Sequence, residues 1–168
     1  THLSGNPAIG LTLGINPNLG MASPDIMGLL TCENVDDAQQ RLVEVLHTVG
    51  TSPQVKLEQY KHGNKLILHR DGGKLPPNHQ SFDAALAMLA FSTRFSTHLD
   101  LSPSYVNLKH PKPSDIAPYQ NLFKCPIRFG QDEYAIFYDK KTLIAPLIFS
   151  NSARSSTPAL HNKSKECD

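Results

Sequence analysis

The chain has 168 residues, 39% of them hydrophobic and 18% charged, and its formal net charge is +1. This length and composition predict one folded domain with a substantial core and exclude a disordered chain. The weak net charge and the scattered lysines and arginines lack the basic face of a nucleic-acid-binding domain, so this chain alone is a poor candidate for contact with DNA or RNA. The longest apolar run, residues 84–91, is too short to cross a bilayer.

Short helical segments are expected before the first long helix. Residues 6–13 open with Asn-Pro and continue with apolar side chains, which predicts a short helix with proline at its first position. A second Asn-Pro pair at residues 16–17 is expected to end this helix. The Ser-Pro pair that opens residues 23–30 predicts another short helical turn.

Residues 34–49 predict the first long helix. Asn34 is a favourable N-cap residue, and the aspartates that follow suit the first helical turn. Apolar residues recur at spacings of three and four and so form one stripe along this helix: Val35, Ala38, Leu42, Val45, Leu46 and Val49. Gly50 is expected to end the helix.

Alternating apolar and polar residues predict a β-hairpin with strands at 54–60 and 65–70 and a turn at 61–64. Residues 71–78, DGGKLPPN, have the composition of a loop. A second long helix is expected over residues 81–98. Its centre, AALAMLAF, is apolar on nearly every face, which indicates burial from several sides.

The last part of the chain predicts an alternation of strands and helices. We expect strands at 105–109, 126–129 and 134–138, a helix over 114–123, and a helical turn with an extended end over 140–148. Residues 151–168 are polar and lack periodicity, as in a linker or tail. The sequence therefore predicts an α+β fold: a single domain with two main helices packed on a mainly antiparallel sheet of about five strands.

Several segments resemble the N-terminal domain of AraC-type transcriptional regulators, specifically the subgroup described as the arabinose-binding domain. The segments are PAIGLTLG at 7–14, HPKP at 110–113, Tyr119 ahead of FKCPIRF at 123–129, and LIAPL at 143–147. One departure is Lys124, which stands where that family has a small residue before Cys-Pro.

The resemblance implies a regulatory domain over residues 1–150. Residues 151–168 would then be a linker toward a C-terminal helix-turn-helix DNA-binding domain outside this chain. It also implies a bacterial, cytoplasmic, non-enzymatic domain that senses a small-molecule effector, forms homodimers, contacts DNA only through that second domain, and needs no cofactor or membrane. The natural dimer elements would be the helix that carries Leu42 and Leu46, or the apolar helix at 84–91.

A candidate ligand site combines aromatic side chains with one cation. The set comprises Phe91, Arg94, Phe95 and Tyr105, which are close in sequence, and Phe129, Tyr134 and Phe137 from the predicted sheet. Such a set could enclose a small acidic or aromatic ligand. A plain hydrophobic core, with Arg94 reaching outward, accounts for the same residues.

Two other functions are alternatives: a small α+β enzyme that uses Cys125 as a nucleophile with a histidine, and a stand-alone small-molecule-binding protein. Small buried thiols commonly only pack, which argues against the enzyme. The three cysteines are far apart and lack CxxC spacing, which favours a reducing compartment. The histidines lack metal-binding spacings, and although His62 and His69 could meet across the hairpin, no metal site is predicted.

Overall fold

The computed structural model describes residues 8–15, 28–49, 53–70 and 78–150. In these residues five helices and five strands alternate along the chain: α1 (Ile9–Gly14), α4 (Val35–Val49), β1 (Gln54–Tyr60), β2 (Gly63–His69), α5 (His79–Thr97), β3 (Tyr105–Asn107), α6 (Ala117–Phe123), β4 (Ile127–Arg128), β5 (Tyr134–Asp139) and α7 (Lys140–Leu143). The expected α+β fold with two main helices is confirmed.

The strands form one mainly antiparallel sheet in the order β1-β2-β5-β3-β4. Strands β1 and β2 are the predicted hairpin, and β5 pairs antiparallel with both β2 and β3. Only the short pair β3–β4 is parallel. The last strand in sequence therefore lies in the middle of the sheet, where it joins the N-terminal hairpin to the C-terminal strands.

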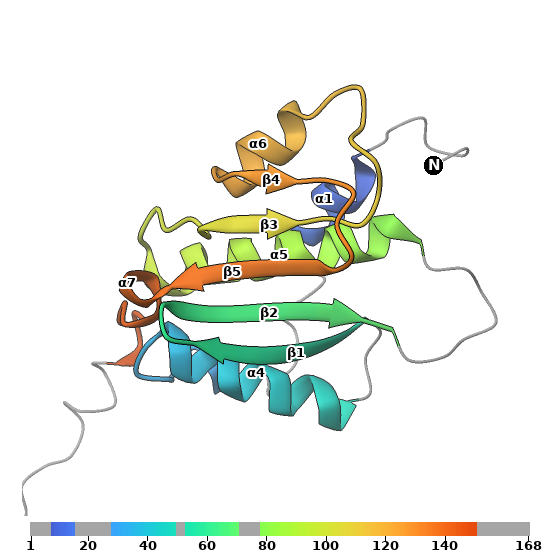
Figure 1. Cartoon of the computed structure of the whole chain (residues 1–168). Helices are drawn as coiled ribbons and strands as arrows, with labels where there is room; N and C mark the ends of the chain where they lie inside the picture. Colours follow the sequence, from blue (N-terminus) through green and yellow to red (C-terminus); the bar gives the residue numbers. More distant parts are fainter. Residues whose placement is uncertain (1–7, 16–27, 50–52, 71–77, 151–168) are drawn as a thin grey trace, which may run out of the picture.

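The helices α4 and α5 cover the same face of this sheet, and the opposite face is turned toward the viewer in Figure 1. Successive side chains along each strand point alternately toward the helices and toward the opposite face of the sheet. Leu66, Val106 and Ile136 face the helices and are almost completely buried. Their neighbours Lys65, Tyr105 and Phe137, which pair with one another across the strands, lie on the other face.

Helix α4 begins as its sequence predicts. The Asp37 N–H donates to Asn34 Oδ1 at 3.0 Å, so Asn34 caps the helix, and Asp36 and Asp37 lie in the first turn. Val35 is buried in the core, and Ala38, Leu42 and Leu46 pack against it. The apolar stripe is confirmed at these positions. Gly50 and residues 71–77, the greater part of the predicted loop, lie outside the described residues.

Helix α5 begins two residues earlier than predicted because Asn78 Oδ1 accepts the Gln80 N–H at 3.1 Å and caps it there. The helix ends at His98, whose φ of 52° lies in the left-handed region. Its predicted apolar centre is buried as expected: Leu86 and Ala87 have no exposed surface, and Ala90 is 1% exposed. Burying a leucine of this kind stabilises the fold by roughly 1.5–3 kcal/mol.

The predicted first helix, α1, lies directly on α5 because of two glycines one helical turn apart. A side chain at Gly10 would overlap the backbone oxygen of Gln80, and one at Gly14 would overlap that of Ala84. The Gly10 N–H donates to Gln80 Oε1 at 2.7 Å in this contact. Glycine is therefore required at both positions for the two helices to approach so closely. Of the predicted helical turn at residues 23–30, only residues 28–30 are among the described residues.

The C-terminal elements match their predictions in order and type, but β3 and β4 are shorter than predicted, β5 is one residue longer and α6 begins later. Strand β3 ends at Asn107 and β4 covers only two residues, while α6 begins at Ala117. Lys124 ends α6 with a φ of 53°, in the left-handed region that favours glycine. The Lys124 ammonium pairs with the exposed Asp100 carboxylate at 2.7 Å. Residues 151–168 lie outside the described residues.

In the part of the chain that the structure describes, none of the helices combines the length and apolar character needed to cross a lipid bilayer. The long helices instead use their apolar sides to cover the sheet.

Candidate functional site

The predicted aromatic set is divided among three places. Phe91 and Phe95 lie one turn apart on α5, and their rings are stacked with centroids 5.9 Å apart. Tyr105 and Phe137 stack on the open face of the sheet, with centroids 5.1 Å apart, and the Arg128 guanidinium lies 4.3 Å from the Tyr105 ring. The structure thus joins these residues in pairs, not in one pocket.

The other two predicted aromatic residues surround the turn that follows β3. Tyr134 stacks on Phe82 of α5, with centroids 4.4 Å apart. Phe129 lies 5.5 Å from the His110 ring and 5.6 Å from the Tyr119 ring, in edge-on geometry. A role of the seven predicted residues in ligand binding stays a prediction.

Arg94, the predicted ligand cation, binds the backbone. Its Nε donates to the Leu101 carbonyl at 2.8 Å, and its two terminal nitrogens donate to the carbonyls of Leu122 and Phe123 at 2.7 and 3.1 Å. Those last two carbonyls belong to the carboxyl end of α6, which a cation stabilises. Arg94 therefore ties α5 to α6 and to the loop before β3.

A buried carboxylate organises the cluster under the His-Pro turn. Asp83 on α5 has no exposed surface; it accepts a hydrogen bond from the Tyr119 hydroxyl at 2.8 Å, and His110 Nε2 lies 3.2 Å from its other oxygen. Burial and the Asp83 charge raise the pKa of Tyr119, so it stays a neutral donor. Burial alone would lower the pKa of His110, but hydrogen bonds to Asp83 and to the Pro111 carbonyl, with the Asp83 charge, leave it raised. The cluster holds the turn against α5.

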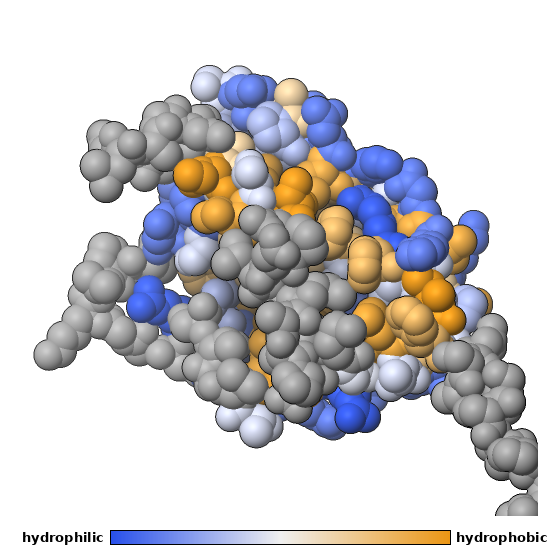
Figure 2. Space-filling model, turned by 180° about the vertical axis from the view of Figure 1, so that it is seen from behind, coloured by the Kyte–Doolittle hydropathy of each residue, from blue (hydrophilic) through white to orange (hydrophobic). Residues whose placement is uncertain are grey.

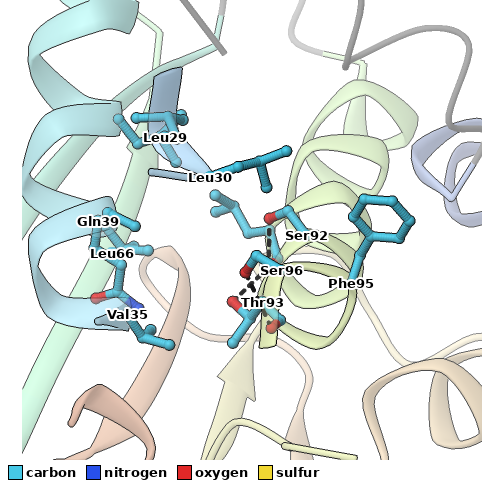
Figure 3. Close-up of a pocket in the computed structure, with 12 residues that line it drawn as sticks. Leu29, Leu30, Val35, Gln39, Leu66, Ser92, Thr93, Phe95 and Ser96 are labelled. Carbon is cyan, nitrogen blue, oxygen red and sulfur yellow. Dashed lines mark hydrogen bonds between the residues drawn. The ribbon is translucent and has the colours of Figure 1, made fainter. Parts of the chain in front are cut away.

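A groove separates α4 from α5 (Figure 3). Its cavity volume is about 70 Å³, and it is partly open to solvent. Side chains of α4 form one wall, those of α5 the other, and Leu66 of β2 lies between them. The groove is lined by Leu29, Leu30, Val35, Ala38, Gln39, Leu42, Leu66, Leu89, Ser92, Thr93, Phe95 and Ser96.

The polar groups of this groove lie on both walls. On the α5 side, the hydroxyls of Ser92 and Ser96 donate to backbone carbonyls one turn back, at 3.0 and 3.3 Å, which leaves their oxygens as acceptors. On the α4 side, Gln39 is only 5% exposed, and its Nε2 has no hydrogen-bond partner among the described residues. Such an orphaned buried donor is rare in folded proteins and requires an explanation. Figure 3 shows the amide of Gln39 on the inner side of α4.

The sequence contained one signal for this site. Gln39 lies four residues after Val35 and three before Leu42, so it is a polar residue within the apolar stripe of α4. The predicted dimer residues are also on this side: Leu42 lines the groove, and Leu46 packs against the core of its own domain. Their role in dimerisation stays a prediction. The exposed apolar side chains include Phe95, which lines the groove, and also Leu99 and Phe149. Figure 2 shows apolar surface on the helix-covered side.

The thiol and imidazole groups do not form a catalytic arrangement in the described residues. Burial raises the pKa of the Cys125 thiol to about 11, and its Sγ lies 3.7 Å from the Pro126 carbonyl, so it is not an activated nucleophile. The hairpin register separates His62 and His69, which could have met across the hairpin: His62 is in the turn, and His69 pairs with Gln54 at the far end. No cluster of three metal-binding side chains occurs among the residues described.

Comparison with known proteins agrees with this fold. The family model for the N-terminal arabinose-binding domain of AraC transcription regulators matches residues 1–147. The structure is similar to that of the transcriptional regulator CdpR from Pseudomonas aeruginosa, with a TM-score of 0.64 and 18% sequence identity over 89% of this chain and 49% of that one. The chain thus spans about half the length of that regulator, and at this identity the likeness shows the fold alone. No curated protein is significantly similar in sequence.

Proposed function

This chain belongs to the family of N-terminal arabinose-binding domains of AraC transcription regulators, and from that premise we propose that it senses a small-molecule effector in the groove between α4 and α5. The chain is a regulatory domain in this family. The observation that carries the placement of the effector is the groove itself, an apolar cleft with an orphaned donor on one wall. Convergent polar groups in an apolar pocket are the usual form of a small-molecule site.

The groove is well placed to change how the domain associates. Its walls are the two long helices, and α4 carries both Leu42, in the groove, and Leu46, one turn further along. A ligand that binds more tightly to one spacing of α4 and α5 shifts the population toward that spacing. We propose that this changes the pairing of two copies through α4 and thereby repositions the DNA-binding domains joined to them.

The domain boundaries and the cellular setting form part of the same proposal. Residues 1–150 would be the regulatory domain, and residues 151–168 a connection to a helix-turn-helix domain that makes all contacts with DNA. Such a regulator acts in the bacterial cytoplasm, as a homodimer. The alternative of an enzyme based on Cys125 has no support from the geometry, because the thiol is partly buried and its pKa is raised.

A thermal-shift screen of metabolites against the 168-residue chain tests the groove. A ligand at a hundred times its dissociation constant stabilises by about 2.7 kcal/mol, which raises the melting temperature by roughly 5–11 °C for a protein of this size. The variant Ser92→Leu fills the groove and should lose that shift. Ser81→Leu, an exposed position in the first turn of the same helix, is the matched control. Equal shifts in both variants would place the ligand elsewhere.

Light scattering on the same samples tests the pairing. We expect dimers, with a dissociation constant that changes when the hit from the screen is added. A chain that stays monomeric at high concentration, with and without that compound, contradicts the dimer part of the proposal and leaves the groove untouched.

A further inference from the structure

We infer that the groove between α4 and α5 selects an electrically neutral effector whose apolar body carries a carbonyl-type oxygen, and that Gln39 Nε2 is the donor that binds this oxygen. The inference rests on the proposed function, since it names the chemical class of ligand for that same site. It is argued from a short relay of hydrogen bonds that fixes which end of the Gln39 amide is left without a partner among the described residues.

The relay begins at a carboxylate. Asn64, which is 4% exposed, donates from its Nδ2 to Asp36 Oδ1 at 2.6 Å. A carboxylate accepts hydrogen bonds and does not donate them, so Asn64 must present its nitrogen on this side. The same Nδ2 also donates to Gln39 Oε1 at 3.3 Å. Gln39 must therefore present its oxygen to Asn64.

This arrangement leaves the nitrogen of Gln39 as the free end of the relay. Reversal of the amide would place two N–H groups against each other and remove a bond from Asn64, so the observed orientation is the favourable one. The outcome is an amide donor, 5% exposed as a residue, that belongs to a side chain of the groove wall and has no partner among the described residues. The nitrogen itself has less than 1 Å² of accessible surface, so a ligand reaches it only when the walls of the groove move apart. An unpaired buried donor costs roughly 1–3 kcal/mol, so an acceptor on a bound ligand recovers that loss.

The rest of the groove defines the other properties of the ligand. Among the described residues, those that line it include no lysine, arginine, histidine, aspartate or glutamate. A charged ligand would lose its hydration there without gaining an opposite charge, which is strongly unfavourable. The leucines and Phe95 suit an apolar body instead. On the opposite wall, the oxygens of Ser92 and Ser96 suit a single donor group, such as the N–H₂ of an amide.

Three small probes of one shape separate these properties: benzamide is neutral and has both a carbonyl and an N–H₂, benzoate is anionic, and benzylammonium is cationic. The experiment is an NMR titration of the isotope-labelled 168-residue chain. The side-chain N–H₂ signals of Gln39, assigned by their absence in Gln39→Met, report directly on the proposed hydrogen bond. We expect benzamide to shift these signals and the methyl signals of Leu42, and to bind at least about ten times more tightly than either charged probe.

Two variants of Gln39 complete the test. Gln39→Met keeps the length and apolar stem of the side chain but removes the donor, and it should weaken benzamide binding roughly three- to tenfold. Gln39→Glu replaces the donor with an acceptor and should reverse the preference, so that benzylammonium binds better than benzamide. Gln120→Met, at an exposed position of α6, is the matched control and should leave all three affinities unchanged.

The possible failures are distinguishable. If benzoate binds as well as benzamide, or if Gln39→Met leaves benzamide affinity unchanged while the Leu42 methyls still shift, the inference about the ligand class is wrong and the groove remains the site. If none of the probes shifts the Leu42 methyls at millimolar concentration, the groove is not a small-molecule site, and the proposed function fails together with this inference. Circular dichroism of each variant confirms that it is folded before the affinities are compared.

Discussion

Arg94 provides a quantitative test of how the two halves of the domain are joined. Its guanidinium donates three hydrogen bonds to the carbonyls of Leu101, Leu122 and Phe123, and its side chain is 17% exposed. The ion pair with Asp100, at 3.8 Å, contributes little because that carboxylate is 70% exposed. Removal of the guanidinium in Arg94→Met leaves the three carbonyls without their donor.

The size of the effect follows from these bonds. Each hydrogen bond from a charged donor contributes about 1.5–3 kcal/mol, and water replaces part of that at the partly open end of α6, so we expect a net loss of about 3 kcal/mol. For a domain of this size, each kcal/mol lowers the melting temperature by roughly 2–4 °C. The expected decrease is therefore roughly 6–12 °C. The melting temperature of Arg94→Lys should lie between those of the wild type and Arg94→Met, because a single ammonium cannot reach all three oxygens.

Differential scanning calorimetry of the purified chain measures this decrease. Arg128→Met is the matched control, because Arg128 is exposed and its main contact is the face of the Tyr105 ring. Loss of such a cation–π contact costs about 0.5–1 kcal/mol. If Arg94→Met lowers the melting temperature no more than Arg128→Met, the three bonds do not hold α6 against α5, and Arg94 becomes available again for the ligand role that its sequence position suggested.

Two further predictions concern titratable groups. The pKa of His110 is higher in the folded protein than in the unfolded chain, where it is about 6.5. The contribution of His110 to stability is therefore complete below that unfolded pKa and is lost as the pH rises through the folded pKa. Between pH 6 and 8, the wild type should lose more stability than His110→Gln. The comparison with His110→Gln is needed because burial lowers the pKa of neighbouring His79, which changes stability with pH in the opposite direction in both proteins. Identical pH profiles of the wild type and the variant would contradict the role of the Asp83 contact. With a pKa of about 11, only about one Cys125 thiol in a thousand is ionised at pH 8, against about one in four for an ordinary cysteine. Alkylation of a variant that retains only Cys125 should be roughly a hundred times slower when folded than in urea, and equal rates would show an exposed, reactive thiol.

Most of the fold was predictable because local signals and burial agree. Asn34 caps α4, the stripe that includes Leu42 faces the core, and the apolar centre of α5 is enclosed as its composition indicates. The first boundary of α5 was missed because Asn78 caps it from within a segment that reads as a loop. The signal was present, but a Pro-rich neighbourhood concealed it.

The candidate site was harder to predict, for reasons of geometry. Tyr134 and Phe137 are three residues apart on one strand, so alternation places them on opposite faces, and they cannot line one pocket. Arg94 looked like a free cation because nothing local reveals that the end of α6 would lie beside it. Gln39 was visible as a polar residue in an apolar stripe, but its orphaned nitrogen depends on Asn64 and Asp36, which only the tertiary structure brings together.

The central position of β5 makes the sheet intolerant of length changes in its last strand. Tyr134–Asp139 bonds to β2 on one side and to β3 on the other. One residue inserted after Tyr134 would exchange inward and outward side chains for the remainder of the strand, so that Ala135 would take the place of Ile136 beneath the helices and Phe137 that of Tyr138. Because neighbours on both flanks share this strand, no compensating slip of a single partner restores the original alignment. Natural variation in chain length is therefore expected in the connecting segments and not in this strand.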